Sequence, residues 1–558
     1  MEAPNKKIVL VRCPQPILFA DDGAVYSPNR TRTPEPTLAQ LHGILRDFAE
    51  QHNTKLEVVQ LDLRDPNNGK LERIHYGNID VPYLGKTLSK IYEGVNIESF
   101  KSVLEDADFI GFTNNFTMSR NVVCEHIRKA RSMFPEKELW IGGRDVYTDR
   151  INALYAAAAR NKNIVLFDGH VFSSLPAYLL WKIKDVGEPF GVTIYGKDGE
   201  TKTIQKRSLL EGVNANGEAR IPLPIYSNPA SLGYFTGSGE GQPDPPFGRF
   251  VHMMISIGCP HSCAYCTTGA REGGYLVRKD METLRQELDL YKKLGVTTLA
   301  IMDDNLLALG PADVIRIMEL VNSYGFGIEY GNGLQLSLLN KDWKSLKDPI
   351  LSNCDSLYAP LEDLTRDRFY DKLDPTKSNL DLMRRIAAEA PTSMRYLTMG
   401  AIVGVPGHTK KALETAFLEN VKNFLEAFNR SHLRVGMTTF NFIPLAGTMF
   451  GDIALKSGRM FADAIYTHPE VCNFGVVSYA PEGMTHRDVF DAYEKALELN
   501  PAGKELGVSY ARLQRYGENA LPENERWKIP PAWRIPGLHL RAQMPRAKRD
   551  AIKQISCG

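Results

Sequence analysis

Cysteine is scarce in this chain, with only eight among 558 residues. So few cysteines do not make a disulfide framework in a chain of this length, which favours a reducing compartment. Long apolar runs are also missing. None approaches the roughly 18 residues of a transmembrane helix, and the first residues lack the apolar core of a signal peptide. A net charge of +1 gives no electrostatic basis for binding nucleic acid or an anionic membrane. We therefore expect a cytoplasmic protein without a nucleic-acid or membrane partner.

The length and composition indicate a globular protein of several domains. With 43% hydrophobic and 24% charged residues, the composition is typical of a folded chain that contacts water. A chain of 558 residues exceeds what one hydrophobic core usually supports, so two or three domains are expected. Changes of pattern divide the chain into residues 1–185, 186–250, 251–450 and 451–558.

Three of the eight cysteines lie together, after a predicted strand at residues 251–257. Cys259, Cys263 and Cys266 have the spacing C-x3-C-x2-C. Three thiolates from one short loop suit an iron–sulfur cluster. A structural zinc site or a four-cysteine cluster would need another thiolate nearby, and the next cysteine in the chain is the distant Cys354. A zinc site and incidental buried thiols are the alternatives.

This motif, with Tyr265 just before its last cysteine, resembles the signature of radical S-adenosylmethionine (SAM) enzymes. The resemblance implies a [4Fe–4S] cluster held by Cys259, Cys263 and Cys266. It also implies that SAM binds the open iron through its amino and carboxylate groups. Such an enzyme needs an electron donor, such as a flavodoxin or a ferredoxin.

Residues 1–185 alternate predicted strands and helices, which favours a mostly parallel, doubly wound, Rossmann-like α/β sheet. The predicted strands are residues 7–13, 56–61, 108–113, 139–143 and 164–167. Ligands of such sheets bind beyond the carboxyl ends of the strands. Four loops should therefore line one crevice, namely residues 14–19, 113–119, 142–147 and 169–174.

The order and spacing of these turns resemble the cobalamin-binding domain that precedes many radical SAM enzymes. The resemblance implies cobalamin contacts in these loops, at Pro14, Asn115, Thr117, Gly142, Gly143, Gly169 and His170. A flavodoxin-like domain that binds another ligand, or none, is the alternative.

His170 lies in a short run that superficially resembles the motif D-x-H-x-x-G, whose histidine ligates cobalt in some cobalamin proteins. Here the run follows the fifth strand rather than the first, and Ser173 stands in place of the glycine. A loop or capping histidine is therefore favoured, and the lower face of the cobalt is expected to lack a protein histidine.

Residues 186–250 are predicted to form a linker with a small hairpin at about 191–199. Beyond it, residues 251–450 return to alternating strands and helices. The six predicted strands, residues 251–257, 297–302, 328–334, 355–359, 396–403 and 435–442, resemble the partial (β/α)6 barrel of radical SAM enzymes. The cysteine loop would then lie at the carboxyl-terminal mouth of the barrel.

Later residues match the radical SAM pattern in order, and the resemblance implies SAM contacts at Tyr265, Asp303, Asp304, Asn332, Glu362 and Gly404. Helix caps are the alternative for the carboxylates among them. Glu272 is a candidate catalytic residue near the open iron or SAM, as proton acceptor, SAM contact or metal ligand. A surface charge paired with Arg271 is its alternative.

Residues 451–558 are expected to form a mostly helical cap that shapes the substrate pocket, with an amphipathic helix around 489–497. A tail rich in aromatics and proline follows at 527–536, and a basic segment at 541–553 is expected to be a solvated helix face.

Together the motifs resemble cobalamin-dependent radical SAM methyltransferases. The resemblance implies methyl transfer from SAM through methylcobalamin to an unactivated or aromatic carbon of a small-molecule natural-product precursor. Tryptophan is one candidate, as in the tryptophan C-methylating enzymes of peptide-antibiotic pathways. The alternatives are a radical SAM enzyme that cyclises, rearranges or oxidises its substrate without methylating it, and a non-catalytic iron–sulfur protein.

Overall fold

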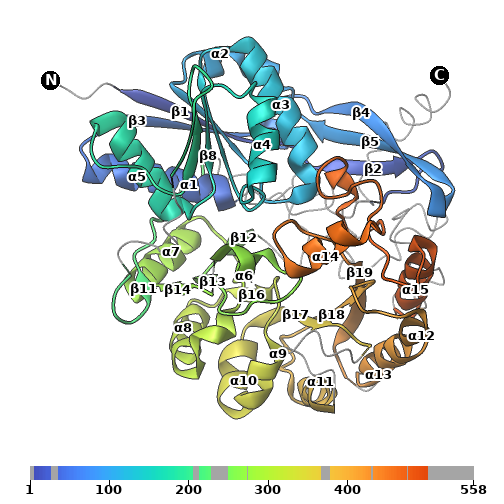
Figure 1. The fold of residues 1–558 in the computed structure, drawn as a ribbon. Coiled ribbons are helices and arrows are strands. Elements are labelled where there is room, and N and C mark those ends of the chain that lie inside the picture. Colours follow the sequence, from blue (N-terminus) through green and yellow to red (C-terminus); the bar gives the residue numbers. More distant parts are fainter. Residues whose placement is uncertain are drawn as a thin grey trace.

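The computed structural model describes residues 5–26, 36–204, 213–227, 249–272, 274–365, 377–428, 431–473 and 475–500. An N-terminal α/β domain lies against an open parallel barrel (Figure 1). This arrangement confirms the predicted α/β class, with a Rossmann-like domain preceding a partial barrel.

The N-terminal sheet has seven strands in the order β10-β9-β8-β7-β6-β1-β3. Its two faces are covered by different helices, because alternate side chains of a strand point in opposite directions. Val9 and Val11 pack with α3 and α4, whereas Ile8 and Leu10 pack with α1 and α5. The parallel strands and these helices are β1 (Lys6–Arg12), β3 (Leu56–Asp62), β6 (Phe109–Thr113), β7 (Glu138–Gly142), β8 (Ile164–Phe167), α1 (Pro36–Gln51), α3 (Arg120–Met133), α4 (Asp149–Ala158) and α5 (Val171–Lys184).

The predicted hairpin belongs to this sheet rather than to a linker. Strands β9 (Val192–Tyr195) and β10 (Thr201–Ile204) extend its edge, and β9 pairs antiparallel with β8. Two glycines allow the chain after β8 to lie close to the chain before β9, since a Cβ on Gly169 would lie 2.7 Å from the Cα of Gly191.

A second, antiparallel sheet of the N-terminal region was not predicted. It consists of β2 (Pro16–Ala20), β5 (Lys86–Gly94) and β4 (Glu72–Val81). Leu18 and Leu88 of this sheet pack against Val471 and Val476 from the C-terminal part of the chain. The two ends of the described chain are therefore joined by one small core.

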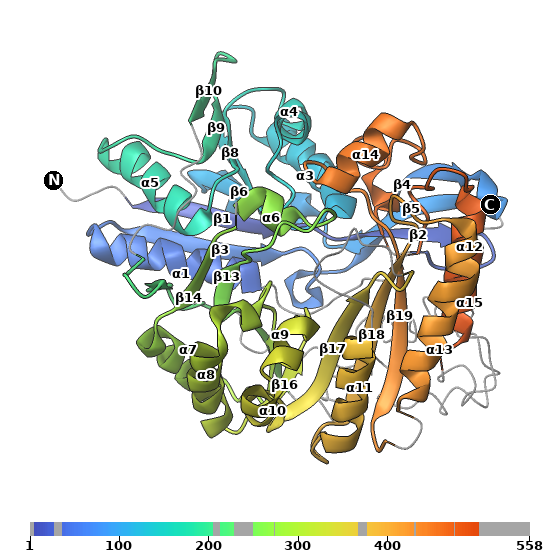
Figure 2. The same ribbon diagram turned by 60° about the horizontal axis from the view of Figure 1, so that its bottom comes forward.

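All six predicted barrel strands are present in one parallel sheet. They are β12 (Phe250–Met253), β15 (Thr298–Ile301), β16 (Gly327–Tyr330), β17 (Cys354–Glu362), β18 (Tyr396–Val403) and β19 (Arg434–Asn441). Figure 2 shows β17, β18 and β19 side by side. The predicted strand at 251–257 is broken in two. Its second half, β13 (Ser256–Gly258), pairs instead with β14 (Leu276–Lys279), which also pairs with β11 (Glu218–Ala219).

Helices cover one face of the barrel sheet. Their apolar sides form one core with alternate strand residues such as Val251, Leu299 and Met399. These helices are α7 (Met281–Lys293), α8 (Pro311–Ser323), α10 (Trp343–Leu351), α11 (Lys377–Glu389), α13 (Leu418–Glu426) and α15 (His486–Glu498). The shorter helices are α2 (Lys101–Glu105), α6 (Thr267–Glu272), α9 (Leu336–Lys341), α12 (Lys410–Ala412) and α14 (Met449–Ser457). Within the described ranges no helix has the length and apolar character needed to cross a membrane.

The predicted amphipathic helix is α15, and its apolar residues Val489, Phe490 and Leu497 are buried. It packs against β18 and β19, so it extends the helical layer beside the barrel. The predicted tail at 527–536 and the basic segment at 541–553 lie outside the described residues.

Candidate active site between the two sheets

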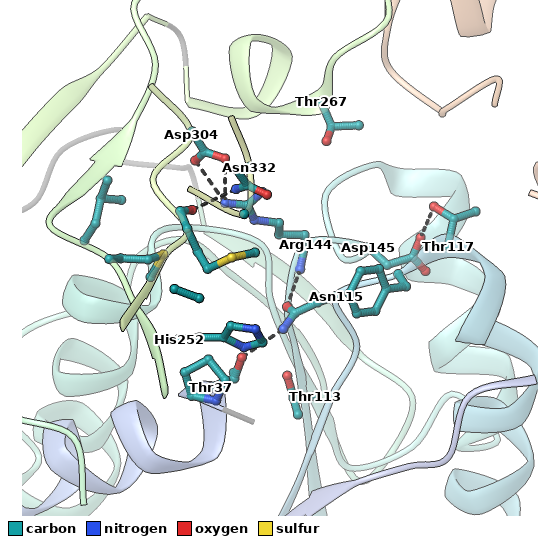
Figure 3. A pocket seen from close by; sticks show the side chains of 18 of the residues that line it. Thr37, Thr113, Asn115, Thr117, Arg144, Asp145, His252, Thr267, Asp304 and Asn332 are labelled. Carbon is teal, nitrogen blue, oxygen red and sulfur yellow. Dashed lines mark hydrogen bonds and ion pairs between the residues drawn. The ribbon is translucent and has the colours of Figure 1, made fainter. Parts of the chain in front are cut away.

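A cavity of about 1070 Å³ lies between the carboxyl edge of the N-terminal sheet and the inner face of the barrel. In Figure 3, Thr37, Thr113 and Asn115 of the N-terminal domain lie around His252 of the barrel. Three of the four predicted loops line this cavity, through Thr113, Asn115, Thr117, Gly142, Gly143, Gly169 and His170.

The fourth predicted loop does not reach the cavity. After β1 the chain turns into β2 and joins the small antiparallel sheet, and Pro14 packs beside Gly94 instead. Pro14, expected to contact cobalamin, is therefore absent from the cavity wall.

The turn after β7 is built from glycine because the chain is crowded there. Gly143 has a φ of +117°, and a Cβ on it would lie 2.2 Å from the carbonyl oxygen of Asn114. The amide of Asn114 in turn donates to the carbonyl of Gly142 at 2.8 Å. These two neighbouring loops are therefore held together, and the backbone of the glycine turn forms part of the cavity wall.

Side chains of these loops are held by one another. The side chain of Asn115 donates to Thr37 at 2.9 Å and accepts from the backbone amide of Arg144 at 3.2 Å. The hydroxyl of Thr117 donates to Asp145 at 2.9 Å, and Asp145 is paired at 2.6 Å with the fully buried Arg120. This wall is therefore a fixed surface rather than a set of free polar groups.

A deep apolar recess continues from the cavity between the sheet and the helices α1 and α5. Leu10, Trp140, Phe167 and Leu175 line it, and Gly111 leaves room between them, since a Cβ there would lie 3.2 Å from Leu10. His170 is the N-cap residue of α5, and its ring lies 5.6 Å from that of Phe172.

The cysteine loop connects β13 to α6. Cys259 is buried, Cys263 and Cys266 are half-buried, and none of the three is part of a disulfide. The side-chain amide of Asn305 donates toward the sulfur of Cys259 at 3.7 Å. In the described ranges no three His, Cys, Asp or Glu side chains converge as on a single ion. A cuboidal cluster has a different requirement, because each thiolate binds its own iron.

Asp303 and Asp304 have different surroundings, although they are adjacent in sequence. The Asp303 carboxylate is buried and accepts hydrogen bonds from the amides of Ile255 and Ser256, at 2.9 and 2.5 Å. Burial raises the pKa of Asp303 to about 6 despite these donors. Expected to contact SAM, it instead holds the break between β12 and β13 and does not line the cavity.

Asp304 does line the cavity and joins the two domains. Both of its carboxylate oxygens lie 2.9 Å from Arg144 of the glycine turn (Figure 3). Thr268 also donates to Asp304, at 3.4 Å. Asn332 lies nearby on the cavity wall, where its side chain donates to the carbonyl of Met302 at 2.8 Å.

Tyr265 and Glu362 meet at the cavity wall. Burial, followed by the neighbouring Glu362 carboxylate, raises the pKa of Tyr265 well above its usual value, and the two side chains form a hydrogen bond. Glu362 has a φ of +59°, a strained conformation for a non-glycine residue, at the point where β17 ends.

The glycine-rich strand reaches the cavity through a different residue than expected. Gly404 is crowded by α15, since a Cβ would lie 2.7 Å from Val489, and it does not line the cavity. Gly400 does line it, and its missing side chain makes room for the hydroxyl of Tyr358.

The backbone of Glu272 ends α6, but its side chain lies outside the described residues, so its role stays a prediction.

Sequence reasoning missed two polar residues on the inner face of the barrel, His252 on β12 and Glu329 on β16. Burial, followed by the charges of Arg12 and Arg64, lowers the pKa of His252 to about 4. Burial, followed by Asp355, raises the pKa of Glu329 to about 7. A polar residue at an inward position of an otherwise apolar strand was the available signal.

A parallel partial barrel with a three-cysteine loop after its first strand defines the radical SAM class of domain. The family model described as Radical SAM superfamily matches residues 253–442. This domain class uses SAM and a [4Fe–4S] cluster, in agreement with the predicted cofactors.

Solved structures extend the likeness over the whole fold. The cobalamin-dependent S-adenosylmethionine radical enzyme OxsB, solved with aqua-cobalamin, is 11% identical with a TM-score of 0.60, covering 99% of this chain and 75% of its own. The radical S-adenosylmethionine methyltransferase TsrM from Kitasatospora setae, solved with cobalamin and a [4Fe–4S] cluster, is 12% identical with a TM-score of 0.55, covering 90% of this chain and 92% of its own. The chain therefore has the fold of cobalamin-dependent radical SAM enzymes.

Proposed function

We propose that this protein is a cobalamin-dependent radical SAM methyltransferase. It would transfer a methyl group from SAM, by way of bound cobalamin, to an unactivated or aromatic carbon of a small natural-product precursor. The observation that carries the proposal is the single cavity, which Tyr265 of the cysteine loop and Gly143 of the N-terminal sheet both line. Two cofactors and a substrate could meet there only if both domains contribute to one site.

The cysteine loop fits an iron–sulfur cluster by the chemistry of its donors. Cys259, Cys263 and Cys266 are soft thiol ligands, none of them used in a disulfide. The loop is braced from outside, because the amide of Phe450 donates to the carbonyl of Ala264 at 2.9 Å. Such bracing would keep the thiolates fixed and exclude water from the cluster.

The remaining cavity wall beside this loop offers contacts for SAM. Asp304, Asn332, Glu362 and Tyr265 are the predicted contacts that line the cavity. The carboxylate of Asp304 or Glu362 would accept hydrogen bonds from the SAM ammonium or ribose. The hydroxyl of Tyr265 is hydrogen-bonded to Glu362, so it would hold that carboxylate in place beside SAM.

The N-terminal wall fits a corrin by its shape and by an unused donor. Gly142, Gly143 and Gly169 leave a wall of backbone, and the apolar recess beside Trp140 is open. The buried hydroxyl of Thr113 has no hydrogen-bond partner among the described residues, so it is available to an amide side chain of the ligand. Asn115, Thr117 and His170 complete the proposed contacts.

When bound, the cluster supplies an electron to SAM and cobalamin supplies a carrier for the methyl group. The chain's own residues would hold these groups and the substrate in the cavity between the two domains. Methylation of an aromatic carbon would release a proton from that carbon, and Glu272 is the proposed acceptor of this proton. A flavodoxin or ferredoxin is the proposed electron donor.

A second function is favoured by the likeness to OxsB, which spans 99% of this chain. OxsB is a cobalamin-dependent S-adenosylmethionine radical enzyme, a description that covers reactions other than methyl transfer. A cyclisation, rearrangement or oxidation in the same cavity is therefore the alternative.

Transfer of label separates the two functions. Anaerobically purified protein, reduced and supplied with methyl-labelled SAM and candidate aromatic precursors including tryptophan, should yield methylated product. Corrin absorption bands should accompany the iron–sulfur shoulder in its spectrum. Substrate conversion without label in the product would refute the methyltransferase and support the alternative.

A further inference from the structure

Four neighbouring barrel strands place one residue each at the same level of the inner face. The register pairs His252 with Ala300, Ala300 with Glu329, and Glu329 with Ser356. All four line the cavity. Adjacent strands are about 4.8 Å apart, so the backbones of His252 and Glu329 are about 10 Å apart, with the small side chain of Ala300 between them. The two longer side chains thus border a gap.

Glu329 lies at an irregularity of the sheet. The pairing of β16 with β17 shifts register between Ile328 and Glu329. Shifts of this kind turn a side chain away from its regular direction and are frequent beside binding sites. No buried position of a parallel strand requires a carboxylate, so packing alone does not account for this residue.

The Glu329 carboxylate makes no hydrogen bond or ion pair within the described part of the chain. Asp355, the charged residue that acts on Glu329, is paired with Arg395 at 3.5 Å. Lys279, which also lines the cavity, is bonded to Glu287. Glu329 is half-buried and has no cation beside it, so its carboxylate is costly to ionise, which agrees with its raised pKa of about 7. The group therefore lacks one thing that a ligand could supply, a positive charge.

We propose that Glu329 recognises the protonated amino group of the substrate, whose body fills the gap over Ala300 toward His252. His252 carries no proton charge at neutral pH, so it does not repel an ammonium group. The rings of Tyr358 and Phe440, 6.4 Å apart on the same cavity wall, suit an aromatic body. The identification of this ligand as the substrate rests on the proposed function. The binding of an aromatic amine beside Glu329 is independent of the proposed function.

A pair of probes of matched shape tests the recognition. Binding of 2-phenylethylamine and of 2-phenylethanol to the cofactor-loaded full-length protein is measured by calorimetry without reductant. The amine should bind about tenfold or more tightly than the alcohol, as expected for one charge-assisted hydrogen bond. Glu329→Gln should abolish this preference while leaving alcohol affinity unchanged. Glu319→Gln, on the exposed face of α8, should retain the preference.

Equal binding of the two probes to the parent protein, including the absence of any binding, would overturn the proposal. So would an undiminished preference in the Glu329→Gln variant. The parent measurement decides by itself if that variant does not fold. An amine preference without labelled product would overturn the proposed function but keep this inference, and labelled product without amine preference would do the reverse.

Discussion

The two walls of the cavity are built in opposite ways. On the N-terminal wall, polar side chains such as Asn115, Thr117 and Asp145 are bound to one another, and glycines expose backbone. On the barrel wall, His252 and Glu329 face the cavity without hydrogen bonds among the described residues. A wall of backbone and mutually bonded side chains suits a large rigid cofactor, whereas polar side chains without hydrogen bonds suit a reacting substrate. Under the proposed function, the N-terminal domain would bind cobalamin and the barrel would select the substrate.

Loss of the cysteine ligands should have the largest effect. Replacement of Cys259, Cys263 and Cys266 together by alanine should remove the cluster, because the described loop offers no other thiolate. Iron analysis should find almost none bound, and SAM cleavage under reducing conditions should stop. Cys124→Ala, at a buried position of α3 away from the cavity, is the control and should keep both. Full iron content in the triple variant would contradict the cluster assignment.

Gly143→Ala should damage the N-terminal wall alone. The added Cβ would lie 2.2 Å from the carbonyl oxygen of Asn114, so the turn must shift. This shift should weaken the binding of the corrin to the turn. We expect about a tenfold or greater loss of cobalamin retained after gel filtration, with iron content unchanged. Gly187→Ala also has a positive φ, but nothing lies within 4 Å of its Cβ, so it controls for backbone strain. Equal retention in parent and Gly143→Ala would exclude this turn as a cofactor wall.

His252 should make the barrel wall sensitive to acid. Its pKa is about 4 in the folded chain against an ordinary 6.5, so below pH 6.5 the unfolded chain takes up a proton that the folded chain refuses. Stability is therefore lost as the pH falls from about 6.5 to about 4, by up to about 3 kcal/mol for the full shift. His252→Gln should remove most of this loss in denaturant unfolding of the cofactor-free protein. His75→Gln, on an exposed strand position, should leave the pH dependence unchanged. An unaltered pH profile in His252→Gln would show that the imidazole is not buried as described.

The ion pair between the walls should have the smallest effect. Arg144 is 43% exposed, so its pair with Asp304 is screened by solvent and worth at most about 1 kcal/mol. Arg144→Gln should lower the melting temperature by at most about 4 °C. The decrease should be smaller at high salt, because salt screens the ion pair. Lys162→Gln is the control, because it breaks a comparable exposed pair with Glu136 within one domain and leaves the contact between the domains intact. A large loss of stability in Arg144→Gln would mean that this contact holds the domains together.

Local motifs and periodic patterns made much of the fold predictable. The cysteine loop needs only residues that are close in sequence, and the strands of both sheets are apolar runs between helices. The small sheet of β2, β4 and β5 was not predictable in this way, because β4 is largely polar and is stabilised by distant parts of the chain. For the same reason Pro14 was expected at the crevice, from which β2 leads the chain away.

The site was less predictable, because strand register decides which of two neighbours faces the cavity. Asp303 and Asp304 are adjacent residues of the same type. Asp303 accepts hydrogen bonds from the backbone at the break between β12 and β13, whereas Asp304 lines the cavity. Gly400 and Gly404 differ in the same way, since α15, distant in sequence, covers the second. Glu329 was overlooked although it is a polar residue on a largely apolar strand, because the sequence does not show whether its carboxylate finds a partner in the fold.

Magnetic coupling between the two cofactors tests most directly whether the walls enclose one active site. Full-length protein loaded with cluster and cobalamin is examined by electron paramagnetic resonance with cobalt as Co(II), before and after reduction of the cluster. We expect the cobalt signal to broaden on cluster reduction, and to remain sharp in the triple cysteine variant. A cobalt signal that is indifferent to the state of the cluster would mean that the two cofactors do not share this cavity.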